Sequence, residues 1–63
     1  MEIIIENQRN EQVKFGSLDS SVEYLQRKLH ENFTVIVNSD SNSQTQQVID
    51  RIRRECRNVL SIR

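Results

Sequence analysis

The feature that most restricts the fold is a repeated change in the spacing of the apolar residues. Two stretches place them at the spacing of an α-helix, and the short runs around these stretches are typical of β-strands. The run Phe33–Val37 separates the two helical stretches, and four of its five residues are β-branched. A chain of 63 residues is long enough for one domain only. We therefore expect residues 1–63 to form a single small domain that contains helices and a sheet.

The N-terminal part of the chain predicts two strands joined as a hairpin. Residues 1–6 include three consecutive Ile residues, and residues 12–15 alternate polar and apolar side chains, as in a half-buried strand. Residues 7–11 are uniformly polar, so we expect them to form the connecting loop. Gly16 then ends the second strand.

The first helical stretch carries one apolar stripe. At spacings of four, three and four, its members are Leu18, Val22, Leu25 and Leu29. This pattern predicts a helix at about residues 19–31. Ser20 and Glu23 match a capping box, with Asp19 as the competing N-cap. Glu23 also stands four residues before Arg27, which is the favourable order for an ion pair within a helix.

The second helical stretch follows a polar loop at residues 38–43. Its apolar face consists of Thr45, Val48, Ile49, Ile52, Cys56, Val59 and Leu60. Its N-terminus fits a capping box in two ways, either as Ser41 with Gln44 or as Ser43 with Gln46.

The end of this second helix has two interpretations. The helix continues to about residue 61, or it ends near Asn58 and Val59–Ile62 forms a last strand. We favour the second, because Asn is an acceptable residue at a helix C-terminus and the apolar tail needs a surface to pack against. The elements then follow the order β-β-α-β-α-β.

This order predicts an α+β or α/β fold, a two-layer sandwich in which both helices cover one face of a small mixed sheet. Alternation along each strand assigns its residues to the two faces. The helix-covered face is expected to hold Ile3, Ile5, Val13, Phe15, Phe33, Val35, Val37 and either Leu60 with Ile62 or Val59. The opposite face is left uncovered and is expected to hold Glu2, Ile4, Glu6, Gln12, Lys14, Thr34, Ile36 and Asn38.

The side chains that catalysis and metal binding require are single and isolated. His30 and Cys56 are the only residues of their types. A general base needs an orienting group and a nucleophile nearby, and a structural zinc site needs paired ligands. Gly16 is the only glycine, which excludes the glycine-rich loops that bind nucleotide phosphates. We therefore expect no enzyme activity, no catalytic residue, no metal, no cofactor and no small-molecule substrate.

The sequence also offers no membrane span and no secretory signal. No apolar run reaches the roughly 18 residues of a transmembrane helix, and the first residues do not resemble a secretory signal. A single Cys cannot form an internal disulfide. We therefore expect a cytoplasmic protein without a membrane partner. Its composition, without Ala or Pro and rich in Asn and Ile, suggests either an AT-rich gene or a viral gene, the latter for a viral accessory protein.

A domain of this size has a small core, and self-association commonly supplements such cores. The uncovered face offers Ile4 and Ile36 beside Lys14. Tyr24 lies off the apolar stripe of the first helix, so we expect its side chain to be exposed. We predict a non-enzymatic protein-interaction module, a regulator, inhibitor or adaptor that binds a protein partner through these residues and forms a homodimer.

The alternative function is nucleic-acid binding. The second half of the chain, from Phe33 onward, holds five Arg and three acidic residues. Arg53, Arg54 and Arg57 share the outward face of the second helix. Arg51 lies to one side, and Asp50 is placed to form ion pairs on the same face. A basic helix face of this kind can bind phosphates or an acidic protein surface.

Overall fold

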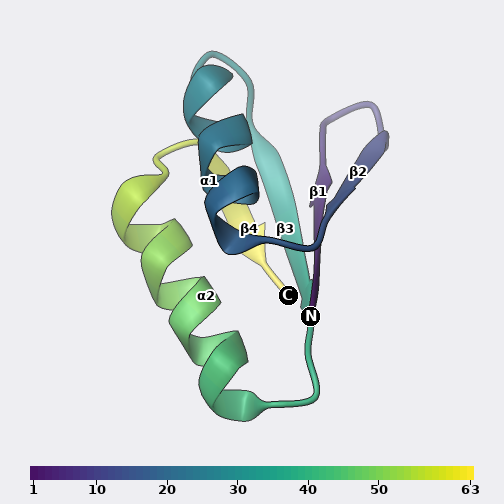
Figure 1. Cartoon of the computed structure of the whole chain (residues 1–63). Helices are drawn as coiled ribbons and strands as arrows, with labels where there is room; N and C mark the ends of the chain where they lie inside the picture. The colour runs from purple at the N-terminus through teal and green to yellow at the C-terminus, as the bar shows by residue number, and fades with distance from the viewer.

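The computed structural model describes residues 1–63 and confirms the predicted order of elements. The elements are β1 (Glu2–Glu6), β2 (Gln12–Phe15), α1 (Leu18–Arg27), β3 (Phe33–Asn38), α2 (Asn42–Glu55) and β4 (Val59–Ile62). The sheet order is β2-β1-β3-β4, with β1 antiparallel to both neighbours and β3 parallel to β4. Both helices lie on the same side of this mixed sheet, as in the predicted two-layer sandwich (Figure 1). Neither helix has the length and apolar character needed to cross a membrane.

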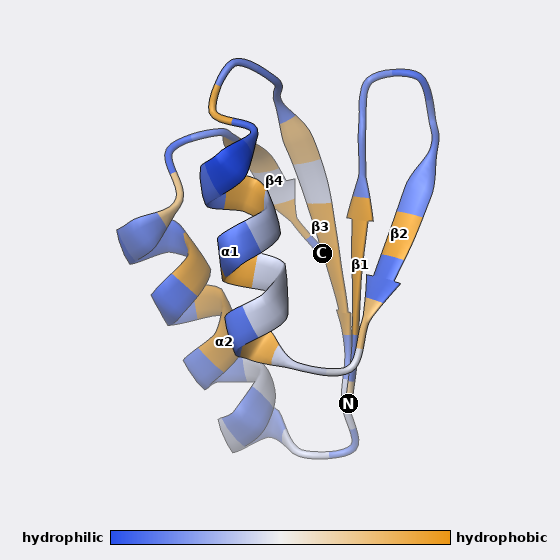
Figure 2. Cartoon of the chain, turned by 45° about the horizontal axis from the view of Figure 1, so that its top comes forward, coloured by the Kyte–Doolittle hydropathy of each residue, from blue (hydrophilic) through white to orange (hydrophobic).

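The loop between β1 and β2 is held by its own polar side chains. Oδ1 of Asn7 accepts hydrogen bonds from the backbone N–H groups of Arg9 at 2.9 Å and Glu11 at 3.0 Å. Asn favours turns because its side chain bonds the nearby backbone in this way. Asn10 adopts φ 66°, in the left-handed region that Asn tolerates better than most residues. The loop therefore needs no apolar anchor, and it is hydrophilic over its whole length (Figure 2).

α1 begins before the position that the capping pattern predicts. The N-cap is Ser17, which has an extended backbone and makes no capping hydrogen bond with its side chain. The predicted capping box of Ser20 and Glu23 is therefore wrong, and so is the alternative cap Asp19, because all three residues lie inside the helix. Leu18, the first residue of the helix, packs against the core.

α1 also ends well before the predicted end near residue 31, because a distant side chain satisfies its last carbonyl groups. The amide of Asn58 donates hydrogen bonds to the backbone oxygen of Leu25 at 2.9 Å and of Lys28 at 3.0 Å. The last carbonyl groups of a helix have no partners within the helix. Leu29 lies beyond this end and is 61% exposed, so its assignment to the apolar stripe is wrong.

α2 matches one of the two predicted capping patterns. Ser41 is the N-cap, and its Oγ accepts a hydrogen bond from the backbone N–H of Gln44 at 3.3 Å. The helix ends just before Cys56, which is its C-cap. The predicted last strand, Val59–Ile62, is confirmed. The prediction that Asn58 caps the C-terminus of α2 is wrong. The side chain of Asn58 instead donates hydrogen bonds to the end of α1.

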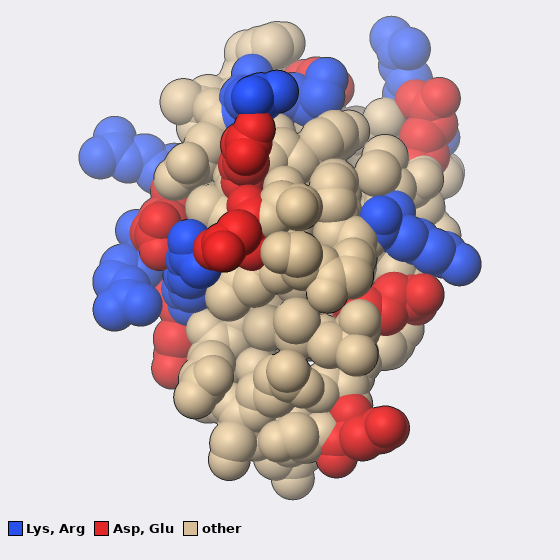
Figure 3. Space-filling view, viewed as in Figure 1, with Lys and Arg blue, Asp and Glu red and all other residues tan.

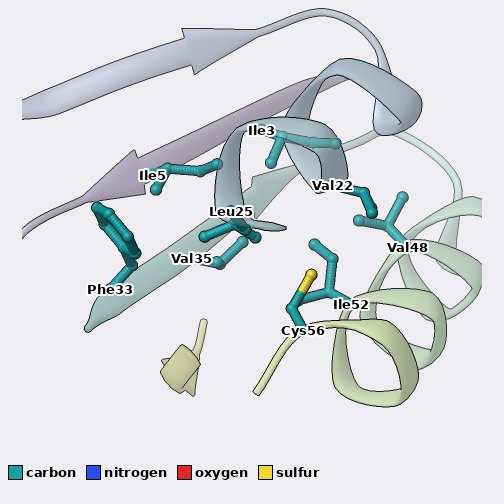
Figure 4. Close-up of a cluster of buried hydrophobic side chains, with 9 residues drawn as sticks. All are labelled: Ile3, Ile5, Val22, Leu25, Phe33, Val35, Val48, Ile52 and Cys56. Atoms are coloured by element: carbon teal, nitrogen blue, oxygen red, sulfur yellow. The ribbon is translucent and has the colours of Figure 1, made fainter. Parts of the chain in front are cut away.

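Nine apolar side chains form the core between the helices and the sheet. They are Ile3, Ile5, Val22, Leu25, Phe33, Val35, Val48, Ile52 and Cys56. Figure 4 shows them converging from β1, β3, α1, α2 and the end of α2. Ser21 is also fully buried, and its Oγ donates a hydrogen bond to the backbone oxygen of Leu18 at 2.7 Å. This hydrogen bond satisfies the buried hydroxyl of Ser21. Among the buried side-chain polar atoms, Oδ1 of Asn58 has no hydrogen-bond partner.

β4 departs from simple alternation because it contains a β-bulge. The register pairs Phe33 with Val59, Thr34 with Ser61 and Val35 with Ile62. Leu60 is the extra residue, and it is 66% exposed. Val59 and Ile62 both pack against the core. The predicted choice between Leu60 with Ile62 and Val59 alone is therefore wrong, since one bulged residue changes the face on which the following residues lie.

Candidate functional surfaces

The face of the sheet opposite the helices has a small apolar centre. Ile4 of β1 lies directly opposite Ile36 of β3, and on its other side Ile4 lies opposite Lys14 of β2. Both Ile side chains are half-buried, and Lys14 is exposed. The structure therefore brings three of the four predicted partner-binding residues together on one face, as the alternation predicted.

The charged side chains of this uncovered face have no ion-pair partners. Glu2 accepts a hydrogen bond from the side-chain amide of Asn38 at 3.3 Å, and Glu6 accepts one from that of Gln12 at 3.0 Å. Neither carboxylate lies within ion-pair distance of a cation, and Lys14 has no acidic neighbour at that distance. The face thus carries unpaired charges of both signs around its apolar centre.

Tyr24, the fourth predicted partner-binding residue, faces the sheet, so its expected exposure is wrong. Its ring centroid lies 5.3 Å from that of Phe15 and 5.8 Å from that of Phe33. Nζ of Lys28 lies 5.4 Å from the centre of the Tyr24 ring. Tyr24 of α1 and Phe15 of the edge strand β2 are both partly buried and pack against the core. Its ring is therefore part of the packing between α1 and the sheet.

Arg51 does not belong to the free basic surface with which it was grouped. Its Nη1 lies 2.6 Å from Oδ1 of Asp19 at the start of α1, and its Nε lies 2.9 Å from Oε2 of Glu55. The hydrogen bond with Asp19, followed by that with Glu55, raises the pKa of Arg51 above its ordinary value. Arg51 therefore links the two helices.

The other three arginines of α2 and its C-terminal end remain free. Arg53, Arg54 and Arg57 are exposed and form no ion pair. The expected pairs with Asp50 are not formed, because Asp50 accepts a hydrogen bond from Nε2 of Gln46 at 2.9 Å. Figure 3 shows acidic side chains interspersed among the basic ones over α2, so the surface is not uniformly basic.

A hollow beside β4 was not expected from the sequence. It has a volume of about 180 Å³ and is lined by Arg53, Cys56, Val59, Leu60, Ser61 and Ile62. Four of the six lining residues are apolar, and Leu60 is the most exposed of the large apolar side chains. The exposure of Leu60 follows from the bulge, whose position the alternation of residues did not indicate.

The two groups considered for catalysis, Cys56 and His30, lie in different environments. Cys56 is buried, and its removal from water, followed by the charge of Glu55, raises the pKa of its thiol. A thiol in this state is a poor nucleophile. His30 is exposed, with Nε2 3.8 Å from a carboxylate oxygen of Glu31. No group of three or more His, Cys, Asp or Glu side chains is placed to hold a metal ion.

In comparisons with known proteins, no family model, no curated protein and no solved structure matches the chain.

Proposed function

We propose that the chain is a non-enzymatic protein-interaction module, a regulator, inhibitor or adaptor, and that it forms a homodimer through the uncovered face of its sheet. The observation that carries the proposal is the pair Ile4 and Ile36, which lie opposite each other on the two central strands with no helix above them. The core comprises only nine buried apolar residues, and a core of this size provides little stability. Burial of a second apolar surface between two copies would add to that stability.

The charges of the uncovered face favour a second copy of the chain as the occupant. Glu2 and Glu6 lie on β1, and Lys14 lies on β2, all without ion pairs. Two identical faces related by a two-fold axis can place the Lys14 of each copy against a carboxylate of the other. A face with both signs of charge is therefore complementary to itself.

Analytical ultracentrifugation over a wide range of concentration tests this proposal. We expect a reversible dimer, and we expect Ile36→Glu to abolish it because the new carboxylate would be buried at the interface. Leu29→Glu is the matched control, since Leu29 is exposed and lies outside the sheet. A wild-type chain that stays monomeric at the highest concentration would contradict the proposal.

Charge exchange tests the predicted pairing across the dimer. Lys14→Glu removes the only cation among the charges of this face, so we expect it to weaken self-association. A variant with Glu2→Lys and Glu6→Lys leaves this face without a carboxylate, so it should also weaken self-association. Mixing the two variants should restore a dimer composed of one of each. If the mixture remains monomeric while the wild-type chain dimerises, the ion pairs across the interface are wrong.

Nucleic-acid binding is a second candidate, favoured by the absence of ion pairs at Arg53, Arg54 and Arg57. If all three bind phosphates, the logarithm of the binding constant should fall linearly with that of the salt concentration, with a slope of about −2.7 for duplex DNA and about −2.1 for single strands. Anisotropy titrations with mixed DNA and RNA at low salt measure this. We expect reversal of the three charges to abolish binding and Arg9→Glu, a change in the hairpin loop, to have a smaller effect.

A cytoplasmic location is part of the proposal. Cys56 is the only Cys and is buried as a free thiol, which suits a reducing compartment. Fractionation of cells that express the chain tests this, and recovery in a secreted or membrane fraction would contradict it.

A further inference from the structure

The outer edge of β4 is open along its backbone. β4 is the last strand of the sheet, with β3 as its only neighbour. The backbone N–H of Arg63 donates to the oxygen of Val35 at 2.8 Å, and the oxygen of Arg63 accepts from the N–H of Val37 at 3.1 Å. Backbone groups alternate in direction along a strand, so the N–H and C=O of Ile62 point away from β3. An added strand could bond to them.

The hollow beside this edge provides a place for a side chain of the added strand. Its apolar lining comes from Cys56 at the end of α2 and from Val59, Leu60 and Ile62 of β4. The bulge leaves Leu60 exposed next to the hollow. In a strand paired with β4, every second side chain would face the helix side of the sheet, where the hollow lies. One apolar side chain of that strand would therefore be buried.

The charge around the hollow indicates what kind of strand would bind. Arg53 lines the hollow, and neither it nor Arg54 and Arg57 has an ion pair. β4 itself, Val59–Ile62, contains no charged side chain. Two copies of the chain paired through β4 would bring their arginines toward each other, whereas an acidic segment would neutralise them.

We propose that the edge of β4 binds an extended, acidic segment of a partner protein by strand addition, with an apolar side chain in the hollow beside Cys56 and a carboxylate at Arg53. Backbone hydrogen bonds supply affinity in this mode of recognition, and the pocket and the charge supply specificity. This surface is distinct from the uncovered sheet face, so the inference goes beyond the proposed homodimer and does not depend on it.

A short fluorescent peptide in which Val alternates with Glu is the probe, and fluorescence anisotropy measures its binding. Two matched peptides test the two parts of the proposal. One has Lys in place of each Glu, and the other is N-methylated at alternate backbone nitrogens so that it cannot donate the hydrogen bonds of an added strand. We expect saturable binding of the first peptide and at least about tenfold weaker binding of both others.

Variants of the chain locate the site. We expect Arg53→Glu to weaken binding about tenfold, with Arg9→Glu in the distant hairpin loop as the matched control. We expect Leu60→Ser to weaken binding several-fold, with Leu29→Ser as the matched control, since the two Leu side chains are similarly exposed, at 66% and 61%. Equal effects of each variant and its control would overturn the assignment of the peptide to this edge.

Backbone amide exchange, followed by NMR, tests the geometry of binding. The Ile62 N–H points toward the open edge, so it should exchange rapidly in the free chain and more slowly with bound peptide. Shifts confined to Arg53, Arg54 and Arg57, with unchanged exchange at Ile62, would overturn strand addition in favour of a purely electrostatic contact.

Two further outcomes identify other occupants and would also overturn the proposal. A single-stranded oligonucleotide that displaces the peptide and slows exchange at Ile62 would assign the edge to nucleic acid. A dimer of the peptide-free chain that Leu60→Ser abolishes would assign it to a second copy. The monomeric Ile36→Glu variant separates this inference from the proposed homodimer, because it should bind the peptide as the wild-type chain does.

Discussion

The two edge strands of the sheet differ in how their outer sides are protected. β2 and β4 each have four residues. β2 carries the charge of Lys14, and its Phe15 is covered by Tyr24 of α1. β4 carries no charge within Val59–Ile62, and its bulge exposes Leu60. Charges on an edge strand oppose the addition of further strands. The comparison indicates that β2 is protected against such addition and that β4 is open to it.

The start of β4 is nevertheless fixed firmly, and the largest effect on stability is expected there. Asn58→Ala would remove the donors for the backbone oxygens of Leu25 and Lys28, which lie 2.9 and 3.0 Å from its amide nitrogen. We expect a loss of about 2–3 kcal/mol in the free energy of unfolding, measured with urea. The matched control is Asn32→Ala, because Asn32 is exposed.

Asn58→Asp separates the hydrogen bonds from the volume of the side chain. Aspartate has nearly the same shape but, when ionised, can only accept hydrogen bonds. It would place a negative charge against two carbonyl oxygens, so we expect it to be at least as destabilising as Asn58→Ala. Wild-type stability of Asn58→Asp would show that the two hydrogen bonds do not fix the start of β4.

Deletion of one residue from each edge strand should have unequal effects. Removing Lys14 from β2 shifts the alternation, so Phe15 and Val13 can no longer both face the helices. We expect this deletion to cost about 2 kcal/mol. Removing Leu60 from β4 should cost less than about 1 kcal/mol, because it removes the bulged residue and leaves Val59 and Ile62 on the covered face. Equal losses in urea unfolding would contradict this difference between the two edges.

Tyr24 covers the protected edge, and its removal should have a smaller effect. Tyr24→Ala would abolish the ring contacts with Phe15 and Phe33, at centroid distances of 5.3 and 5.8 Å. We expect a loss of about 1–2 kcal/mol in the free energy of unfolding. Tyr24→Phe keeps both ring contacts and is the matched control. A loss for Tyr24→Phe as large as that for Tyr24→Ala would mean that the hydroxyl and not the ring stabilises α1 on β2.

Much of the fold could be predicted because it depends on neighbours along the chain. Alternation placed Ile3 and Ile5 on the covered face and Ile4 on the other, and the spacing of apolar residues located both helices. The ion pair between Glu23 and Arg27 follows from one helical turn and was also predicted. These features need no information about contacts between distant residues.

The errors concern contacts between residues far apart in the sequence. The end of α1 is set by Asn58, which is 33 positions after Leu25. Arg51 pairs with Asp19, which is 32 positions before it. No local pattern reports either contact. The first contact ends α1 before Leu29 and leaves that side chain exposed. The second changes the candidate site, because it removes Arg51 from the free basic surface.

The remaining errors depend on how the elements pack. A helical stripe predicted Leu25 as buried, but the position of α1 over β2 determined that Tyr24 is covered as well. The bulge at Leu60 likewise depends on the fit of β4 against β3. The bulged residue Leu60 lines the hollow beside β4, and alternation of polar and apolar residues did not locate this hollow.

The smallest expected effect concerns the reactivity of the Cys56 thiol. This reactivity tests directly whether solvent reaches Cys56 through the hollow beside β4. Its thiol pKa is raised by burial, then by the charge of Glu55, whereas Arg51 lowers it. Alkylation requires the thiolate, so at pH 8 the native chain should react more slowly with iodoacetamide than the urea-unfolded chain. An equal rate in the two states would show that solvent already reaches the thiol through the hollow.

The same shift predicts how stability changes with pH. A thiol with a raised pKa in the folded state keeps its proton to higher pH than it does in the unfolded chain. The stability that this contributes is therefore complete below the ordinary thiol pKa of about 8.5 and is lost as the pH rises through the folded value. We expect the free energy of unfolding to fall more steeply above that pH for the wild-type chain than for Cys56→Ala, which cannot ionise at this position. Parallel pH profiles of the two proteins would show that Cys56 is as well hydrated in the folded chain as in the unfolded one. The burial of Cys56 in the apolar lining of the hollow beside β4 would then be wrong.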